Sequence, residues 1–331
     1  IGTMSASLEI TDTSEVAMNI MPATIPSRCA IYVDRNGELI WGGVIWSRTY
    51  NSNSQRIQIN AREFLSYFER RRIVSDLGYT SVDQLTIAQQ LILNAQGAGA
   101  GNIGVAVGTE TSGVTISKNY YAYELKTVYS ALSDLSRSST GFDYRIDVAY
   151  DGSNNPTKTL KLGYPRLGTV YSATNATAPV FEFPAGNVIE YEWPEDGSLA
   201  ANVLYTSGAG SNEGKLISTQ TNTTYQNAGW PILEDSANYS DVTDQTLLTN
   251  LAAGQLAAVV YPPTTLKIVA PANQEPEIGT FNIGDDVRVR ILDPRFPNGI
   301  DQTMRLVSLA VTVGESNHAE TQTLTLSLPT S

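Results

Sequence analysis

The sequence is poor in the residues that most often build metal and redox sites. Its 331 residues include one cysteine, Cys29, and one histidine, His318. A single cysteine cannot form an intrachain disulfide, so packing must stabilise the fold, as expected for assembly in a reducing cytosol. His318 has Glu315 and Glu320 nearby but no further His or Cys ligand for a metal. We therefore expect a surface histidine, a small buried Cys29 and no metal site.

Long apolar runs and positive charge are also scarce. No apolar run is long enough to span a bilayer, and residues 1–20 lack the core of a signal peptide. The chain opens on Ile1 instead of methionine, so the native N-terminus is expected upstream. Lys and Arg number 21 against 33 Asp and Glu, a net charge of −12. This balance argues against a dedicated nucleic-acid binder, which normally carries a basic surface.

No motif predicts an enzyme. Gly99, Gly101 and Gly104 spell a dinucleotide motif, but a predicted helix precedes them and a predicted strand follows, the reverse of the required order. No G-x-S-x-G motif supplies a serine nucleophile. Paired carboxylates could catalyse glycoside hydrolysis, but turn and cap roles explain them more simply. The pairs are Glu195/Asp196, Glu234/Asp235 and Asp285/Asp286. We expect no catalytic residue and no cofactor.

The C-terminal part alternates in polarity. Its apolar side chains recur at every second residue, with Arg288 and Arg290 on the opposite face of the first strand, because side chains alternate along an extended chain. The pattern predicts a curled antiparallel sheet or small barrel with one wet face. The expected core positions are Val287, Val289, Ile291, Val307, Leu309, Val311, Val313, Leu324, Leu326 and Leu328.

Residues 1–60 also read as strands. Asn36-Gly37 predicts a hairpin because this pair supports positive φ values, and Gly42-Gly43 predicts a bulge or tight bend. A second hairpin is expected from 142–150 and 159–164. Helices are predicted at 61–72, 82–95, 122–136 and 243–260.

Details of two of these helices can be tested against the structure. Ser81 and Gln84 form a predicted capping box at the start of the helix at 82–95. The helix at 243–260 is expected to pack its stripe of Leu247, Leu251 and Leu256 on the C-terminal sheet.

Four arginines form the most basic local cluster: Arg62, Arg70, Arg71 and Arg72. One interpretation is a solvated helix face on which they pair with Glu63 and Glu69. The other is a contact to an acidic partner subunit, which suits the acidic remainder of the chain.

Together these blocks resemble the tail-hub minor tail proteins of siphophages, a family related in fold to the central hub of contractile-tail baseplates and to type VI secretion spikes. Three stretches carry the resemblance. They are 40–45 continuing through 57–71, the helix–glycine loop–helix block from 82 to 136, and 283–289 with its closing strands.

The resemblance implies a β-rich α+β chain. It implies two β-barrel tube-type domains, an α/β middle region and one long late helix. The expected division is 1–75 for the first barrel and its following helix, 76–185 for the middle region, and 186–331 for the second barrel with helix 243–260 inserted.

The resemblance also implies a function without catalysis. The chain would be a virion protein at the tail tip, assembled in the host cytoplasm. A homotrimeric ring would join the six-fold tail tube to the three-fold tip. Its partners would be the distal tail protein ring, the tape measure protein and a central tip fibre or spike. DNA would pass through an acidic or neutral bore without specific binding, with Arg70–Arg72 facing a neighbouring protein. The alternatives are a tail-associated glycan hydrolase or glycan-binding module, and a hexameric distal tail protein.

Overall fold

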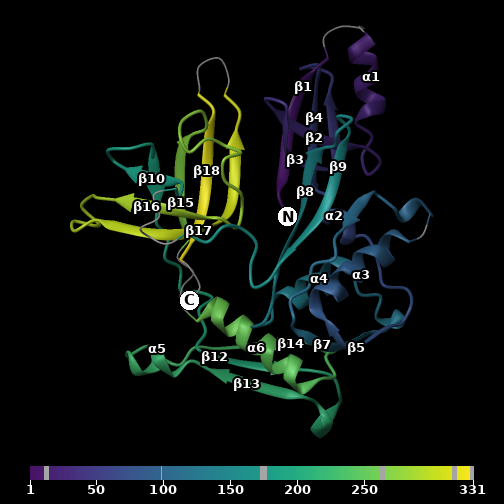
Figure 1. The fold of residues 1–331 in the computed structure, drawn as a ribbon, viewed down its shortest axis with the longest axis vertical. Coiled ribbons are helices and arrows are strands. Elements are labelled where there is room, and N and C mark those ends of the chain that lie inside the picture. The colour runs from purple at the N-terminus through teal and green to yellow at the C-terminus, as the bar shows by residue number, and fades with distance from the viewer. Residues whose placement is uncertain (11–14, 98, 172–176, 261–264, 315–318, 329–331) are drawn as a thin grey trace. The chain divides into compact units, whose positions relative to one another are not determined.

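The chain forms two compact units, each with its own β-sheets and helices (Figure 1). The computed structural model describes residues 1–10, 15–97, 99–171, 177–260, 265–314 and 319–328. The first unit comprises 1–164 and 241–247, and the second comprises 165–240 and 248–331. The predicted β-rich α+β class is confirmed. The three-part division at residues 75 and 185 stays a prediction.

The described residues of the first unit form three sheets, with strand orders β1-β4-β3-β2, β5-β7 and β6-β9-β8. Its strands are β1 Thr3–Glu9, β2 Ala30–Arg35, β3 Glu38–Asn51, β4 Arg56–Glu63, β5 Leu77–Asp83, β6 Val105–Val107, β7 Thr115–Tyr120, β8 Asp143–Tyr150 and β9 Pro156–Gly163. Its helices are α1 Glu15–Ala23, α2 Leu65–Phe68, α3 Gln84–Gln96 and α4 Val128–Ser136, with short 3-10 helices η1 Gly99–Gly101 and η2 Ala122–Glu124.

The predicted hairpin between β2 and β3 is confirmed. Asn36 and Gly37 have φ values of 56° and 88°, the left-handed conformations that a tight two-residue turn requires. The β8–β9 hairpin is also confirmed, and the Tyr150 hydroxyl of β8 donates a hydrogen bond of 2.9 Å to Asp34 of β2. Cys29 is half-buried against the core of the four-stranded sheet, so the prediction of a buried cysteine is only partly right.

Strand β3 has two register shifts, and neither falls on the two glycines that were expected to mark a bulge. Against β2 the register shifts between Leu39 and Trp41, and against β4 it shifts between Ile45 and Ser47. Gly42 and Gly43 serve close packing instead, since a Cβ on Gly43 would lie 2.2 Å from the backbone oxygen of Arg62 on β4.

The predicted helix at 61–72 is wrong over most of its length. Strand β4 continues to Glu63, where it pairs with Gly43 of β3, and α2 is a single turn. Phe64, Leu65 and Phe68 are nevertheless buried, as the helical spacing suggested. Ladder hydrogen bonds on both sides of β4 outweigh the helical periodicity of so short a segment.

Besides the core of its four-stranded sheet, the first unit has another hydrophobic core, which lies between α3, α4 and the strands around them. Leu91 and Leu132 have no exposed surface there. Asp83, and not Ser81, caps α3 by accepting the backbone N–H groups of Leu85 and Thr86, so the predicted capping box is wrong. Helix α4 begins six residues later than predicted, at Val128, and η2 occupies the expected first turn.

In the second unit, the part of the chain that the structure describes forms two sheets and one long helix. The strand orders are β10-β16-β17-β18-β15-β11 and β13-β12-β14. Its strands are β10 Val180–Phe183, β11 Glu190–Glu192, β12 Val203–Ser207, β13 Ile217–Thr221, β14 Glu234–Asn238, β15 Thr265–Pro271, β16 Asp286–Ile291, β17 Ile300–Thr312 and β18 Thr321–Ser327. Its helices are α5 Thr223–Asn227, 3-10 helix η3 Asn212–Gly214 and the late helix α6 Gln245–Val259, whose first three residues belong to the first unit.

The six-stranded sheet curls into a half-barrel. Its edge strands β10 and β11 come together through the rings of Phe183 and Tyr191, whose centroids lie 5.3 Å apart. Val287, Val289 and Ile291 are buried inside, as predicted. The core contains Phe181, Leu266, Ile268, Met304, Leu306, Leu324 and Leu326 as well.

The predicted face of β17 is wrong in part. The register shifts between Leu306 and Ser308, and this bulge leaves Val307 exposed while Leu309 packs against the core. Val313 lies beyond the end of β17 and is also exposed. One inserted residue reverses the alternation, because side chains repeat with period two.

The late helix is confirmed, but its predicted packing partner is wrong. Leu247, Leu251 and Leu256 are buried. Helix α6 packs on the three-stranded sheet, as Figure 1 shows. Thr249 of this helix accepts a hydrogen bond from Ser218 of β13. None of its residues belongs to the core of the six-stranded sheet.

Candidate interaction surface

Two of the four clustered arginines hold the fold together. Arg62 donates two hydrogen bonds, of 2.7 and 2.9 Å, to the carboxylate of Glu69. The bond to Glu69 raises the pKa of Arg62. Arg71 donates to the carbonyl oxygen of Ala95 at the end of α3, through Nε at 3.1 Å and Nη2 at 2.8 Å. Both side chains therefore connect α2 and its flanking residues to other elements.

The other two arginines lie on the surface. Arg72 is exposed and donates to the carbonyl oxygen of Leu125 at 3.0 Å. Arg70 is exposed, and its guanidinium has no side-chain partner among the described residues. The four arginines thus do not form one patch, and contact of any of them with a partner subunit stays a prediction.

Arg72 belongs to a segment that runs antiparallel to residues 120–128, and Arg70 precedes this segment in the bend after α2. Arg72 forms a β-bridge with Thr127, and Leu77 pairs with Tyr120. Between these pairings, the carboxylate of Asp76 accepts the backbone N–H of Ala122 at 2.8 Å. The turn that contains η2 is therefore held by side chains at both of its ends.

This turn presents apolar side chains to solvent. The rings of Tyr121 and Tyr123 stack with centroids 5.4 Å apart and planes inclined by 13°. Tyr123 is 78% exposed, Leu125 53% and Val74 73%. Leu125 has a φ of 47°, a left-handed conformation that costs a residue with a Cβ roughly 1–2 kcal/mol. We call Arg70, Arg72, Val74, Tyr123 and Leu125 the Tyr123 surface.

Sequence reasoning missed this surface because it assigned residues 122–136 to one helix. The signal that could have found it is the run Tyr120-Tyr121-Ala122-Tyr123, which places several tyrosines together. Tyrosine is among the residues enriched at protein interfaces.

A buried group of four charges lies elsewhere in the first unit. Lys118 contacts the Asp241 carboxylate at 3.0 Å, and Lys126 contacts Asp241 and Asp134, each at 2.6 Å. The Lys118 and Asp241 side chains are only 5% and 12% exposed. Two positive and two negative charges balance, as a buried ionic group requires.

The charges within this group shift each other's protonation. Burial alone would raise the pKa of Asp241, but the lysine charges and hydrogen bonds outweigh it and lower that pKa to about 2. Burial lowers the pKa of Lys118, and the two carboxylates raise the pKa of Lys126 in spite of burial. The low pKa keeps the Asp241 carboxylate ionised at neutral pH, and its ion pairs with Lys118 and Lys126 anchor residues 241–247 in the first unit.

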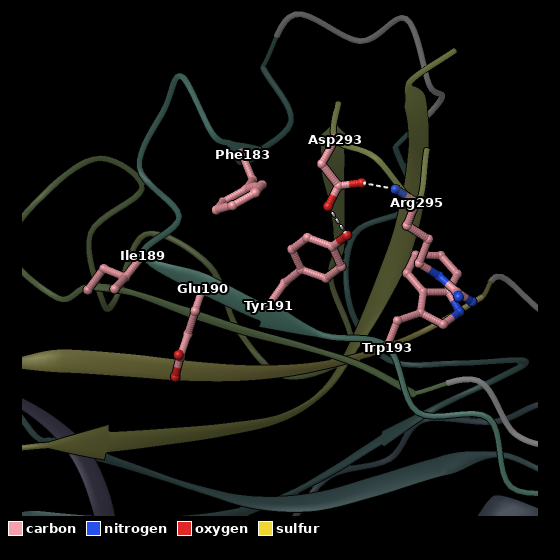
Figure 2. Close-up of a pocket in the computed structure, with 7 residues that line it drawn as sticks. All are labelled: Phe183, Ile189, Glu190, Tyr191, Trp193, Asp293 and Arg295. Carbon is pink, nitrogen blue, oxygen red and sulfur yellow. Dashed lines mark hydrogen bonds between the residues drawn. The ribbon is translucent and has the colours of Figure 1, made fainter. Parts of the chain in front are cut away.

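An open groove of about 370 Å³ lies on the second unit (Figure 2). It is lined by Phe183, Ile189, Glu190, Tyr191, Trp193, Asp293 and Arg295. The Tyr191 hydroxyl donates a hydrogen bond to the Asp293 carboxylate. Burial and this bond raise the pKa of Tyr191 to about 12, and the same bond lowers the pKa of Asp293.

The groove does not hold the carboxylate pair that glycoside hydrolysis needs. Figure 2 shows Glu190 pointing away from Asp293, on the opposite side of β11 from Tyr191. Asp293 also accepts the backbone N–H groups of Arg295 and Phe296, each at 3.0 Å, so it caps a turn. These two carboxylates therefore do not face each other across a substrate.

The adjacent acidic pairs have structural roles. Asp285 accepts the backbone N–H groups of Thr169 at 2.6 Å and Asn282 at 2.7 Å. Asp286 forms a 2.6 Å ion pair with Arg166. Both carboxylates thereby fix the segment before β10 against the start of β16, which supports the turn and cap roles inferred from the sequence.

The other two pairs are similar. Glu195 pairs with Arg295, and Asp196 accepts the backbone N–H of Ser198 at 2.9 Å. Glu234 accepts the Tyr205 hydroxyl at 2.8 Å. Asp235 accepts the backbone N–H of the residue that follows it.

Among the described residues, no group of three or more His, Cys, Asp and Glu side chains could hold a metal ion. His318 and Glu315 lie outside them. No described helix has the length and apolar character needed to cross a bilayer. The glycine motif follows α3 and precedes β6, the helix-then-strand order predicted from the sequence.

Comparison with known proteins identifies the fold. No protein-family model and no curated protein matches this sequence. The 43 kDa tail protein of prophage MuSo2 from Shewanella oneidensis has a TM-score of 0.62 at 12% identity, over 98% of this chain and 88% of that one. A tail protein from Neisseria meningitidis MC58 has a TM-score of 0.57 at 14% identity, over 88% and 81%. The prophage tail protein gp18 from Listeria monocytogenes has a TM-score of 0.51 at 14% identity, over 98% and 84%.

The similarity extends over most of this chain and over most of each of the three matched chains. The predicted resemblance to phage tail proteins is therefore confirmed at the level of fold. At 12–14% identity the likeness carries no residue-level function.

Proposed function

We propose that this chain is a structural protein of a phage tail, and specifically a hub that closes a homotrimeric ring at the tail tip. The observation that carries the proposal is the fold itself, which phage tail proteins share over at least 88% of the chain. Two major curved sheets in one chain support the trimer, since three chains would then present six such sheets to the six-fold tail tube.

Open sheet edges also support assembly. In the four-stranded sheet, β1 and β2 are the edge strands, and only one side of each is paired within the sheet. Much of β1 is exposed. Unpaired edges are templates for association, and a closed ring is one arrangement that covers them.

The hub would act by geometry and charge. It would adapt six-fold to three-fold symmetry and leave a bore through which the genome passes. Three copies carry a charge of −12 each, and acidic or neutral lining would keep DNA from adhering. The distal tail protein ring, the tape measure protein and a central tip fibre or spike would be its neighbours in the virion. No enzymatic step is part of this proposal.

Native mass measurement of the purified chain, together with a symmetric reconstruction of the tail, tests the proposal. We expect a species with the mass of three 35.7 kDa chains, placed at the tip. A six-copy ring would favour the distal tail protein instead. A chain that remains monomeric both in solution and in the tail would refute the hub.

A further inference from the structure

We infer that the Tyr123 surface is a contact through which one copy of this chain binds the acidic surface of a second copy. The inference rests on the proposed self-assembly and goes further by naming the contact residues, the chemistry of the partner surface and the turn that presents them.

The composition of the surface is that of an interface core. The surface combines one tyrosine, two aliphatic side chains and two arginines, with Val74, Tyr123 and Leu125 each more than half exposed. Tyr123 stacks on Tyr121, and Arg72 binds the carbonyl oxygen of Leu125. Tyr and Arg are the residues that most often carry the energy of protein interfaces. Apolar side chains brought together in this way are what a partner surface would remove from water.

The surface is also built to keep its shape. Arg72 and Asp76 hold the turn by hydrogen bonds of 3.0 and 2.8 Å to backbone groups of Leu125 and Ala122. Stacking on Tyr121 restricts the Tyr123 ring. Because these groups are ordered before binding, little conformational entropy remains to be lost on association.

Leu125 adds a second indication. Its left-handed backbone, at φ 47°, is unfavourable for leucine, and glycine or asparagine would adopt it more readily. Local strain of this kind persists where surrounding contacts impose it, and it concentrates at functional surfaces. Here the strained residue also presents a large apolar side chain to solvent.

Charge identifies the partner surface. The Arg70 guanidinium has no side-chain partner among the described residues, and Arg72 binds only a neutral carbonyl. The chain as a whole carries 33 acidic against 21 basic residues, so a second copy presents a predominantly acidic surface. DNA is a poorer match, because a phosphate-binding surface gains nothing from exposed Val74 and Leu125.

The first test measures the trimer's dissociation by native mass spectrometry and sedimentation. Arg70→Glu combined with Leu125→Ala should weaken association at least tenfold and should leave thermal unfolding of the isolated chain near that of wild type. Leu93→Ala is the matched control, since Leu93 on α3 is also 53% exposed but lies outside the surface, and it should assemble normally. Raising the salt concentration should weaken association of the wild type, because salt screens charges. The difference in association strength between wild type and the double variant should therefore become smaller.

The second test identifies the partner. A photo-crosslinking amino acid replaces Tyr123, and the crosslinked peptides are sequenced from the assembled tail. Acidic peptides of this same chain are expected. Crosslinks to a different tail protein would overturn the assignment to a second copy. If wild type forms trimers and the double variant forms them equally well, this inference fails while the hub stands. If the wild-type chain assembles neither in solution nor in the tail, the hub proposal and this inference both fail.

Discussion

Replacing Asp241 by asparagine should destabilise the first unit by about 3 kcal/mol. Within the buried ionic group, Lys118 contacts the carboxylate of Asp241, whereas Asp134 contacts Lys126. Removing one partner of a buried pair costs about 3–5 kcal/mol, because the other charge is left uncompensated. We place the loss at the low end, since Lys118 keeps its 3.2 Å hydrogen bond to the Asp241 carbonyl oxygen.

Asp134→Asn is the matched control. It removes a carboxylate of the same type, but Lys126 keeps its 2.6 Å contact with Asp241, so a loss of about 1 kcal/mol is expected. A double variant, Lys118→Met with Asp241→Asn, should recover part of the stability, because it removes the orphaned charge along with its partner. Urea unfolding of each variant gives the free energies.

Lowering the pH should weaken the ion pairs of Asp241 with Lys118 and Lys126, because it protonates the Asp241 carboxylate. The folded pKa of Asp241 is about 2, below its ordinary value of 3.8, so the group contributes stability above pH 4 that is lost as the pH falls towards 2. A shift of this size corresponds to roughly 2–3 kcal/mol. The difference between wild type and Asp241→Asn should therefore shrink over that interval. Equal losses for Asp241→Asn and Asp134→Asn, or a difference independent of pH, would refute this account.

Alternation of polarity predicted much of the fold because it follows from the two-residue period of a strand. It predicted the buried face of β16, whereas the β2–β3 hairpin was predicted from the turn residues Asn36-Gly37. It could not predict the bulge after Leu306 that turns Val307 outward. One inserted residue does not disturb the alternation seen in the sequence, but it reverses which side chains face the core after the bulge. The same limit applies to the bulge after Ile45.

Long-range pairing decided the remaining cases. Residues 61–63 have helical spacing but are held in β4 by strands on both sides. The late helix has an unmistakable leucine stripe, yet nothing in the stripe states which sheet receives it. The Tyr123 surface depends on Arg72 and Asp76 meeting a turn about fifty residues away, a proximity that only the folded chain creates.

Two further substitutions test packing. Leu251→Ala in α6 should lower the free energy of unfolding by about 2–5 kcal/mol, because Leu251 is buried. Leu199→Ala, at an exposed site, is the control and should change it by no more than about 0.5 kcal/mol. Equal effects of the two substitutions would show that the helix is peripheral. Gly43→Ala should destabilise the four-stranded sheet, since its Cβ would lie 2.2 Å from the Arg62 carbonyl oxygen, a backbone atom that a rotamer change cannot move. Separating β3 from β4 at that point would break their ladder, so we expect a loss of about 1–3 kcal/mol in thermal or urea unfolding. Gly152→Ala, where no atom lies within 4 Å of the added carbon, is its control, and equal melting temperatures for the two variants would contradict the close approach.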